Sequence, residues 1–191
     1  MKKSILVLIM LSCTILLTSP VPAQSPDFRS VNWGMTPERV KMLEPEDQVD
    51  AEVLSSEINT LVYSTNAYSI PSKLEYIFYK NQAIAGVYYI GDNGHFTEKE
   101  KMTRYYALEE ELSKLYGKPR HPEELGTNDT QDDMESIRAG GLMYVSEWGV
   151  EDKQMGISLV LDQEESKLRL RIMYFTLDEQ LRVPYDETYN L

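Results

Sequence analysis

The segment Phe28–Leu43 constrains the fold more than any other stretch, because it predicts a short helix that needs a larger body to pack against. The residue order indicates a strand that ends at Trp33, a glycine turn, and a helix that begins after Thr36, a good N-cap followed by proline. A second proline, two residues after the segment, stops the helix after about two turns. So short a helix is not stable alone, and we expect Val40 and Leu43 to form its packing face.

The box formed by Gly34, Met35 and Thr36, followed by Val40, resembles the opening of domains in the BamE/SmpA outer-membrane lipoprotein family and the β-lactamase inhibitor protein family. The resemblance covers about sixteen residues. It implies a tandem arrangement of halves, each a helix followed by strands, and binding of other proteins through the sheet. No functional residue of those families carries over to a position in this chain.

Residues 1–23 have the order of a signal peptide: two lysines, an apolar core from Ile5 to Leu17, and a small-residue cleavage site ending at Ala23. The apolar core is too short for a membrane span. Cys13, the only cysteine, lies inside this core rather than closing it, so we expect no lipid anchor there. The mature chain would then be exported, periplasmic or secreted, with no transmembrane span, no disulfide and no thiol ligand.

The formal charge of −12 is that of an acidic chain, which phosphate backbones would repel, so we expect no nucleic-acid partner. Residues 24–191 suit one domain of this length. Within them, seven apolar or alternating runs are candidate strands. They are Val49–Leu54, Thr60–Thr65, Lys73–Tyr79, Ala83–Ile90, Gly141–Trp148, Gln154–Leu161 and Lys167–Thr176.

Glu98–Tyr116 is predicted to be the longest helix, because Thr97 and Glu100 form a capping box and Gly117 follows as a C-terminal cap. Its apolar stripe consists of Met102, Tyr105, Leu108, Leu112 and Leu115.

The order of helix, strands, helix, strands favours an α+β fold, an antiparallel sheet with helices on one face. It would be either a single domain over residues 24–191 or two pseudo-repeats, 27–92 and 95–191. Asn66–Pro71 and Arg120–Gly140 are expected to be loops.

Residue types that carry chemistry are sparse. His95 and His121 lie in different loops without ligand spacing to a partner, so no metal site is predicted. The acidic run Asp129–Glu135 lacks the central glycine and terminal glutamate of a calcium loop. No catalytic residue and no cofactor are predicted. A hydrolase with carboxylates assembled by the fold, or a small-ligand-binding protein, remains the alternative to a binding module.

Alternation in Lys167–Thr176 puts Arg169, Arg171 and Met173 on the sheet face opposite the expected core, and the same reasoning puts Tyr89 there. Such a face could receive an anionic partner, or its cations could pair with acids of the chain itself. We therefore predict a protein-interaction module whose partner is an envelope or extracellular protein. Its predicted binding residues are Tyr89, Arg169, Arg171 and Met173.

Overall fold

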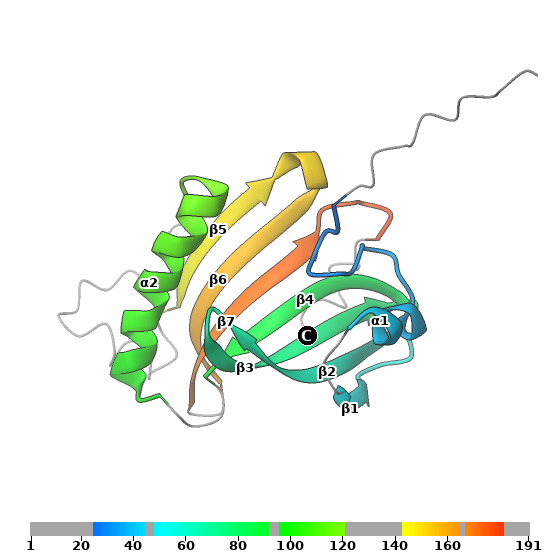
Figure 1. The fold of residues 1–191 in the computed structure, drawn as a ribbon, viewed down its shortest axis with the longest axis horizontal. Helices are drawn as coiled ribbons and strands as arrows, with labels where there is room; N and C mark the ends of the chain where they lie inside the picture. The colour runs from blue at the N-terminus through cyan, green and yellow to red at the C-terminus, as the bar shows by residue number, and fades with distance from the viewer. Residues whose placement is uncertain (1–24, 45–47, 92–95, 121–142, 165–166, 182–191) are drawn as a thin grey trace, which may run out of the picture.

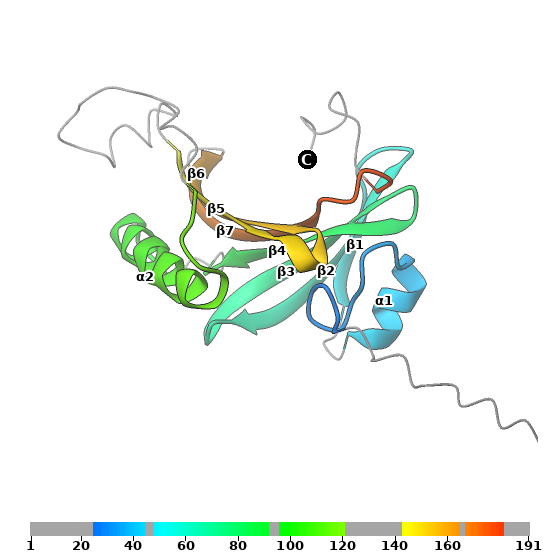
Figure 2. The same cartoon turned by 90° about the horizontal axis from the view of Figure 1, so that it is seen from above.

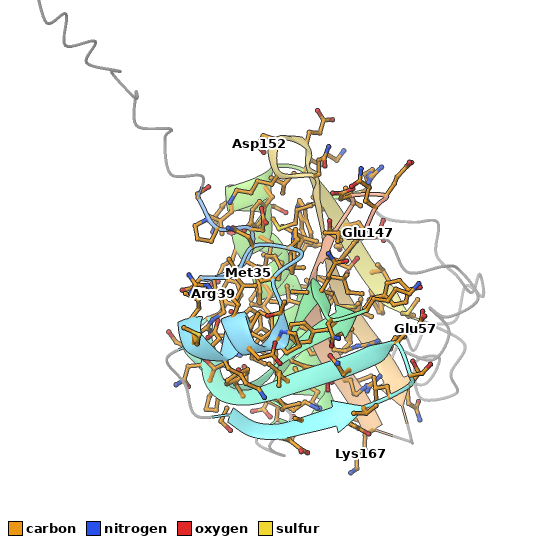
Figure 3. All side chains as sticks on the ribbon, turned by 90° about the vertical axis from the view of Figure 1, so that its right-hand side faces the viewer. Met35, Arg39, Glu57, Glu147, Asp152 and Lys167 are labelled. Atoms are coloured by element: carbon orange, nitrogen blue, oxygen red, sulfur yellow. The ribbon has the colours of Figure 1, made fainter. Side chains whose placement is uncertain are left out.

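The computed structural model describes residues 25–44, 48–91, 96–120, 143–164 and 167–181, which build one seven-stranded antiparallel sheet with two helices (Figure 1). The strands are β1 Gln48–Val53, β2 Ile58–Ala67, β3 Ile70–Tyr79, β4 Gln82–Ile90, β5 Tyr144–Val150, β6 Met155–Glu164 and β7 Lys167–Thr176. The helices are α1 Pro37–Leu43 and α2 Glu98–Tyr116, and the 3-10 turn η1 Glu151–Lys153 joins β5 to β6. Figure 3 shows Asp152 of this turn and Lys167 of β7 at opposite ends of the sheet.

The sheet consists of two meanders joined at one seam. The strand order is β1-β2-β3-β4-β7-β6-β5, so β4 of the first meander lies beside β7 of the second. The seam runs from Ala85 opposite Phe175 to Tyr89 opposite Arg171. The alternative that the two halves are pseudo-repeats stays a prediction.

The predicted α+β class is wrong, because the sheet dominates the fold, although both helices lie on one side of it. Of the residues that the structure describes, 50% are in strands and 24% in helices, with only two short helices, so this part of the chain is a β-rich sheet. One reason is that the expected loop Asn66–Pro71 is mostly strand. Tyr68 and Ser69 alone form the turn, with φ of 51° and 63°. This left-handed region suits tight hairpin turns, but non-glycine residues seldom adopt it, and the sequence pattern therefore does not reveal the turn.

The N-terminal segment is only partly as predicted. α1 has the expected Thr36 cap, whose side chain accepts a hydrogen bond from the Arg39 amide, and Val40 is buried. The expected strand before it is wrong, because Phe28 and Val31 instead pair across a turn. The segment is attached to the sheet a few residues later in the chain, where the Gly34 amide donates a hydrogen bond to the Ala83 carbonyl of β4.

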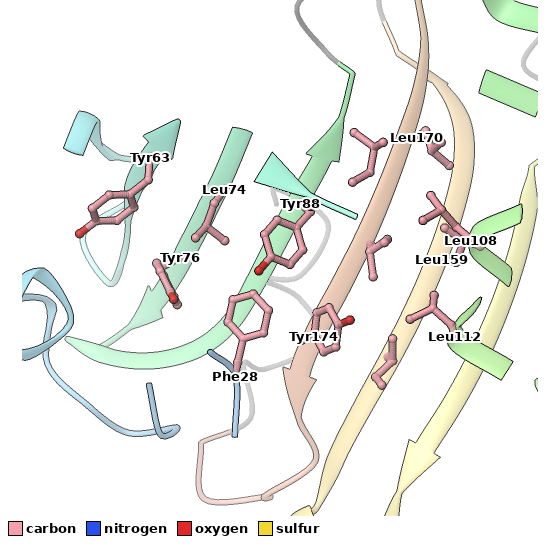
Figure 4. Close-up of a cluster of buried hydrophobic side chains, with 14 of the residues drawn as sticks. Phe28, Tyr63, Leu74, Tyr76, Tyr88, Leu108, Leu112, Leu159, Leu170 and Tyr174 are labelled. Carbon is pink, nitrogen blue, oxygen red and sulfur yellow. The ribbon is translucent and has the colours of Figure 1, made fainter. Parts of the chain in front are cut away.

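α2 has the predicted bounds and capping box. Tyr105, Leu108 and Leu112 are buried, and Figure 4 shows the two leucines near Leu159 of β6. Leu115, predicted in the same stripe, is 67% exposed. Tyr116, which lies nearer the centre of the buried stripe on a 3.6-residue period, contacts the core instead.

Each sheet face has its own apolar cluster. The larger cluster joins one face to Val40 of α1 and to Leu108 and Leu112 of α2. Seen from above, both helices lie on the same side of the sheet (Figure 2). The smaller cluster is built from Ile58, Ile77, Tyr79, Ile84, Ala85 and Val87, with Tyr89, Met173, Phe175 and Leu181 packed against it.

Candidate functional site

The four predicted binding residues lie close together on the face away from the helices. Lys73 of β3, Tyr89 of β4 and Arg171 of β7 are successive partners across three strands, and we call these three residues the cationic row. The Arg169 guanidinium lies 6.0 Å from the centre of the Tyr89 ring. Met173 packs against the smaller apolar cluster rather than against the charged side chains.

The side chains of the cationic row are fixed by their neighbours. The Lys73 ammonium lies 4.2 Å from the Tyr89 ring centre, a cation–π distance. Burial, and then the carboxylate of Glu75, raise the pKa of the Tyr89 phenol, which therefore stays neutral. Arg171 donates to the Asp162 carboxylate, and Arg169 lies 4.0 Å from the same group.

The two arginines of this face therefore pair with an acid of the chain itself, Asp162. The exposed fractions of the Arg169, Arg171 and Asp162 side chains are 21%, 17% and 17%. The buried Nε of Arg171 has no hydrogen-bond partner in the described part of the chain. An unsatisfied buried donor is uncommon and calls for an explanation.

The face carries no large exposed apolar side chain among the described residues. The large hydrophobic residues that are exposed lie on or next to α1, β1, α2 and β7, and they are Met42, Val53, Leu54, Tyr106, Leu115 and Leu177. Contact with this face would therefore rest on aromatic and charged groups.

A second candidate site lies on the helix-bearing side. It is a cleft of about 410 Å³ between the N-terminal segment, the β2–β3 turn and the end of α2. Its lining residues are Pro26, Asp27, Phe28, Arg29, Asn66, Ala67, Tyr68, Tyr88, Tyr116, Lys153 and Tyr174.

Phe28 anchors one wall of the cleft. Its ring centre lies 5.6 Å from that of Tyr76, 5.4 Å from that of Tyr88 and 4.8 Å from that of Tyr174 (Figure 4). The ring rests directly over Gly86, where an added Cβ would lie 2.2 Å from Phe28 Cε1. This contact requires glycine at position 86.

Arg29 is held beside the cleft by a buried carboxylate. Its Nε lies 3.2 Å from Oε1 of Glu44 and its Nη2 lies 3.1 Å from Oε2, while the Glu44 side chain is fully buried. Its Nη1 donates to the Thr65 hydroxyl at 3.4 Å and to the Tyr88 hydroxyl at 3.3 Å. Tyr76 donates a further hydrogen bond to Glu44. Because the ion pair is bidentate, the positive charge of Arg29 is compensated in place.

The remaining polar groups of the cleft are mostly phenols. The hydroxyls of Tyr68 and Tyr174 lie 3.1 Å apart and share a hydrogen bond. Burial raises the pKa of both phenols, so they remain protonated at neutral pH. Lys153 donates to the Pro26 carbonyl at 2.9 Å.

Sequence reasoning missed this cleft, because its residues come from segments far apart in the chain. Tyr68 is predicted to lie in a loop and Tyr116 at the end of a helix, and Lys153 falls between two predicted strands. Only one local indication in the sequence points to a role for Arg29. It is a charged residue next to the aromatic Phe28, in a segment that must pack against a larger body. Its φ of 53° cannot be read from the sequence.

Several predictions fall on residues outside the described ranges, namely the signal peptide, His95, His121 and the acidic run Asp129–Glu135. Where the structure describes the chain, no three His, Cys, Asp or Glu side chains come together as metal ligands. No helix in those ranges is long and apolar enough to cross a membrane. Comparison with known proteins gives no match to a family model, a curated protein or a solved structure.

Proposed function

We propose that the protein is an exported interaction module that binds an envelope or extracellular protein through the cationic row and its neighbours Arg169 and Met173. The observation that carries this proposal is the alignment of Lys73, Tyr89 and Arg171 across three strands on the face away from both helices.

The chemistry of the face supports protein binding. Tyr and Arg are the side chains most enriched among residues that dominate binding energy at protein interfaces. Here two cations, Lys73 and Arg169, lie within 6.0 Å of the Tyr89 ring centre, and the partners of Arg171 and Tyr89 hold the side chains in place. Side chains that are already ordered lose less conformational entropy on binding.

The charges indicate the partner's chemistry. Lys73, Arg169 and Arg171 outnumber the neighbouring carboxylates of Glu75 and Asp162, in a chain whose formal charge is −12. The complementary partner surface presents a carboxylate toward the exposed parts of the Arg169 and Arg171 side chains and an apolar group toward Met173. Such complementarity would also steer association and make it depend on salt.

The test is affinity capture from an envelope or extracellular fraction, with wild type and three variants as bait. Arg171→Glu reverses one charge of the row, and Tyr89→Ala removes its ring. Arg39→Glu is the matched control, because Arg39 is exposed on α1, on the other side of the sheet. Thermal melts establish that each bait is folded.

We expect the partner that wild type enriches to be depleted about tenfold or more with Arg171→Glu and with Tyr89→Ala. Arg39→Glu should capture it as wild type does. Equal capture by all four baits, or equal loss with the Arg39 control, would contradict docking on the sheet face.

A further inference from the structure

The cleft beside Phe28 has the size of a small-molecule site. Ligand pockets in proteins run from about 300 to 1,000 Å³, and this cleft measures about 410 Å³. Its lining residues Phe28, Tyr88 and Tyr174 belong to the larger apolar cluster on the helix-bearing face, whereas Tyr89 of the cationic row packs against the smaller cluster on the other face. An occupant of the cleft is therefore independent of the proposed protein partner.

The charges lining the cleft are compensated. Arg29 is neutralised by the buried Glu44 through two parallel contacts. Lys153 donates to the Pro26 carbonyl, and Asp27, whose carboxylate accepts a hydrogen bond from the Trp33 amide, adds an opposite charge to the same lining. An anionic ligand would have to compete with Glu44 for Arg29, and a cationic ligand would meet Arg29 and Lys153. The lining therefore favours an uncharged ligand.

The remaining lining groups suit a ligand rich in hydroxyls. Tyr68, Tyr88, Tyr116 and Tyr174 contribute phenols, and Asn66 contributes an amide. A phenol both donates and accepts hydrogen bonds, as an alcohol does, and an amide offers both functions on one plane.

The backbone beside the cleft is strained where a ligand would touch it. Arg29 is neither glycine nor asparagine, yet it has a φ of 53° and is held there by Glu44, Thr65 and Tyr88. Backbone conformations of this kind cost about 1–3 kcal/mol and cluster at binding and active sites. The contacts with Glu44, Thr65 and Tyr88 hold the side chain of Arg29 in the wall of the cleft before any ligand arrives.

We propose that this cleft binds a neutral saccharide of about one or two rings. The tyrosine hydroxyls and Asn66 take its hydroxyl groups. The saccharide could be free in solution or the exposed end of a surface glycan, and the recognition chemistry is the same for both.

The test is saturation-transfer NMR on the purified protein with a panel of neutral sugars: glucose, N-acetylglucosamine, maltose and cellobiose. Glucuronate is the charged probe, and insoluble polysaccharide in a sedimentation assay is the surface probe. We expect signal from at least one neutral sugar and weaker or no signal from glucuronate. Binding only to the insoluble polymer would assign the site to a surface glycan, and binding to the free sugars would assign it to a dissolved one.

Two variants probe the lining. Tyr116→Ala and Asn66→Ala should each weaken sugar binding about tenfold, since each removes one contact at a partly or fully exposed position. Tyr106→Ala is the matched control, because Tyr106 is an exposed tyrosine on the same helix outside the cleft. No signal from any sugar or polymer, preference for glucuronate, or equal binding by Tyr116→Ala and Tyr106→Ala would overturn the proposal. Arg171→Glu should leave sugar binding unchanged, which separates this site from the sheet face.

Discussion

The ring of Phe28 occupies the space that a side chain at Gly86 would need, with Phe28 Cε1 2.2 Å from the position of that Cβ. Gly86 lies in β4 opposite Tyr174 of β7, and the Phe28 ring centre is 4.8 Å from that of Tyr174. The N-terminal segment is therefore packed onto the seam between the two meanders. We expect a substitution at any one of these three residues to alter the packing of the other two.

Gly86→Ala should destabilise the fold by about 1–3 kcal/mol or more, because the methyl group displaces the Phe28 ring. Gly149→Ala is the control, since nothing lies within 4 Å of a Cβ added there. It should change the free energy of unfolding by less than about 0.5 kcal/mol. Urea denaturation of both variants measures the difference, and equal costs would show that Phe28 is not seated on Gly86.

Leu112→Ala should cost about 2–5 kcal/mol, because the side chain is fully buried between α2 and the sheet. Leu115→Ala, on the same helix but 67% exposed, should cost less than about 0.5 kcal/mol. The comparison holds helix propensity constant, so the difference reports docking of α2. A loss below about 0.5 kcal/mol for Leu112→Ala would mean that the helix is not packed on the sheet.

Glu44→Leu should cost about 3 kcal/mol, because it leaves Arg29 and the Tyr76 hydroxyl without their acceptor. Adding Arg29→Met should recover part of that loss, and a double-mutant cycle measures the coupling. The solvent-exposed pair of Lys114 and Glu110 is the reference: Glu110→Gln should have little effect. Strict additivity of the Arg29 and Glu44 changes would rule out a stabilising pair.

The fold should lose stability in alkali. Burial raises the pKa of Tyr105 to about 12 from 10.0, although its hydrogen bond with Ser146 acts in the opposite direction. A raised folded-state pKa means that the stabilisation is complete below the unfolded value near 10.0 and is lost as the pH rises through about 12. Denaturation at a series of pH values should show this decline.

Tyr105→Phe provides the control for the alkaline prediction, because it removes that titration while keeping the ring. Its stability should fall less steeply between pH 10.0 and about 12 than that of wild type. Identical slopes for the two proteins would show that Tyr105 does not contribute to the decline.

Local sequence signals were sufficient to predict the bounds of individual helices and strands. The bounds of α2 and β7 agree with prediction, because caps and periodicity act within a few residues. The class was wrong, in part because the turn between β2 and β3 uses the non-glycine residues Tyr68–Ser69 with positive φ, so that strand residues were expected to form a loop.

The candidate sites also show that local sequence signals do not reveal which residues from distant segments meet. Strand alternation correctly grouped Tyr89, Arg169, Arg171 and Met173 on one face, since it depends only on parity. It could not show that Arg171 meets Asp162 of another strand. Nor could it show that Glu44, which looks like a surface residue in an acidic connector, is buried against Arg29. Such pairs depend on the tertiary fold.

The pairing of β4 with β7 also bears on the order in which we expect the hairpins and the seam to form. The β2–β3 and β3–β4 hairpins close over two-residue turns, whereas the seam pairs Ala85 with Phe175, far away along the chain. Closing so long a loop costs entropy that is repaid only once the ladder forms, so we expect the hairpins to form early and the seam late. Tyr88 and Tyr174, from opposite sides of the seam, both line the cleft. The cleft is therefore complete only after the seam has formed, and a chain that has folded its first meander alone lacks the wall that Tyr174 and Lys153 supply.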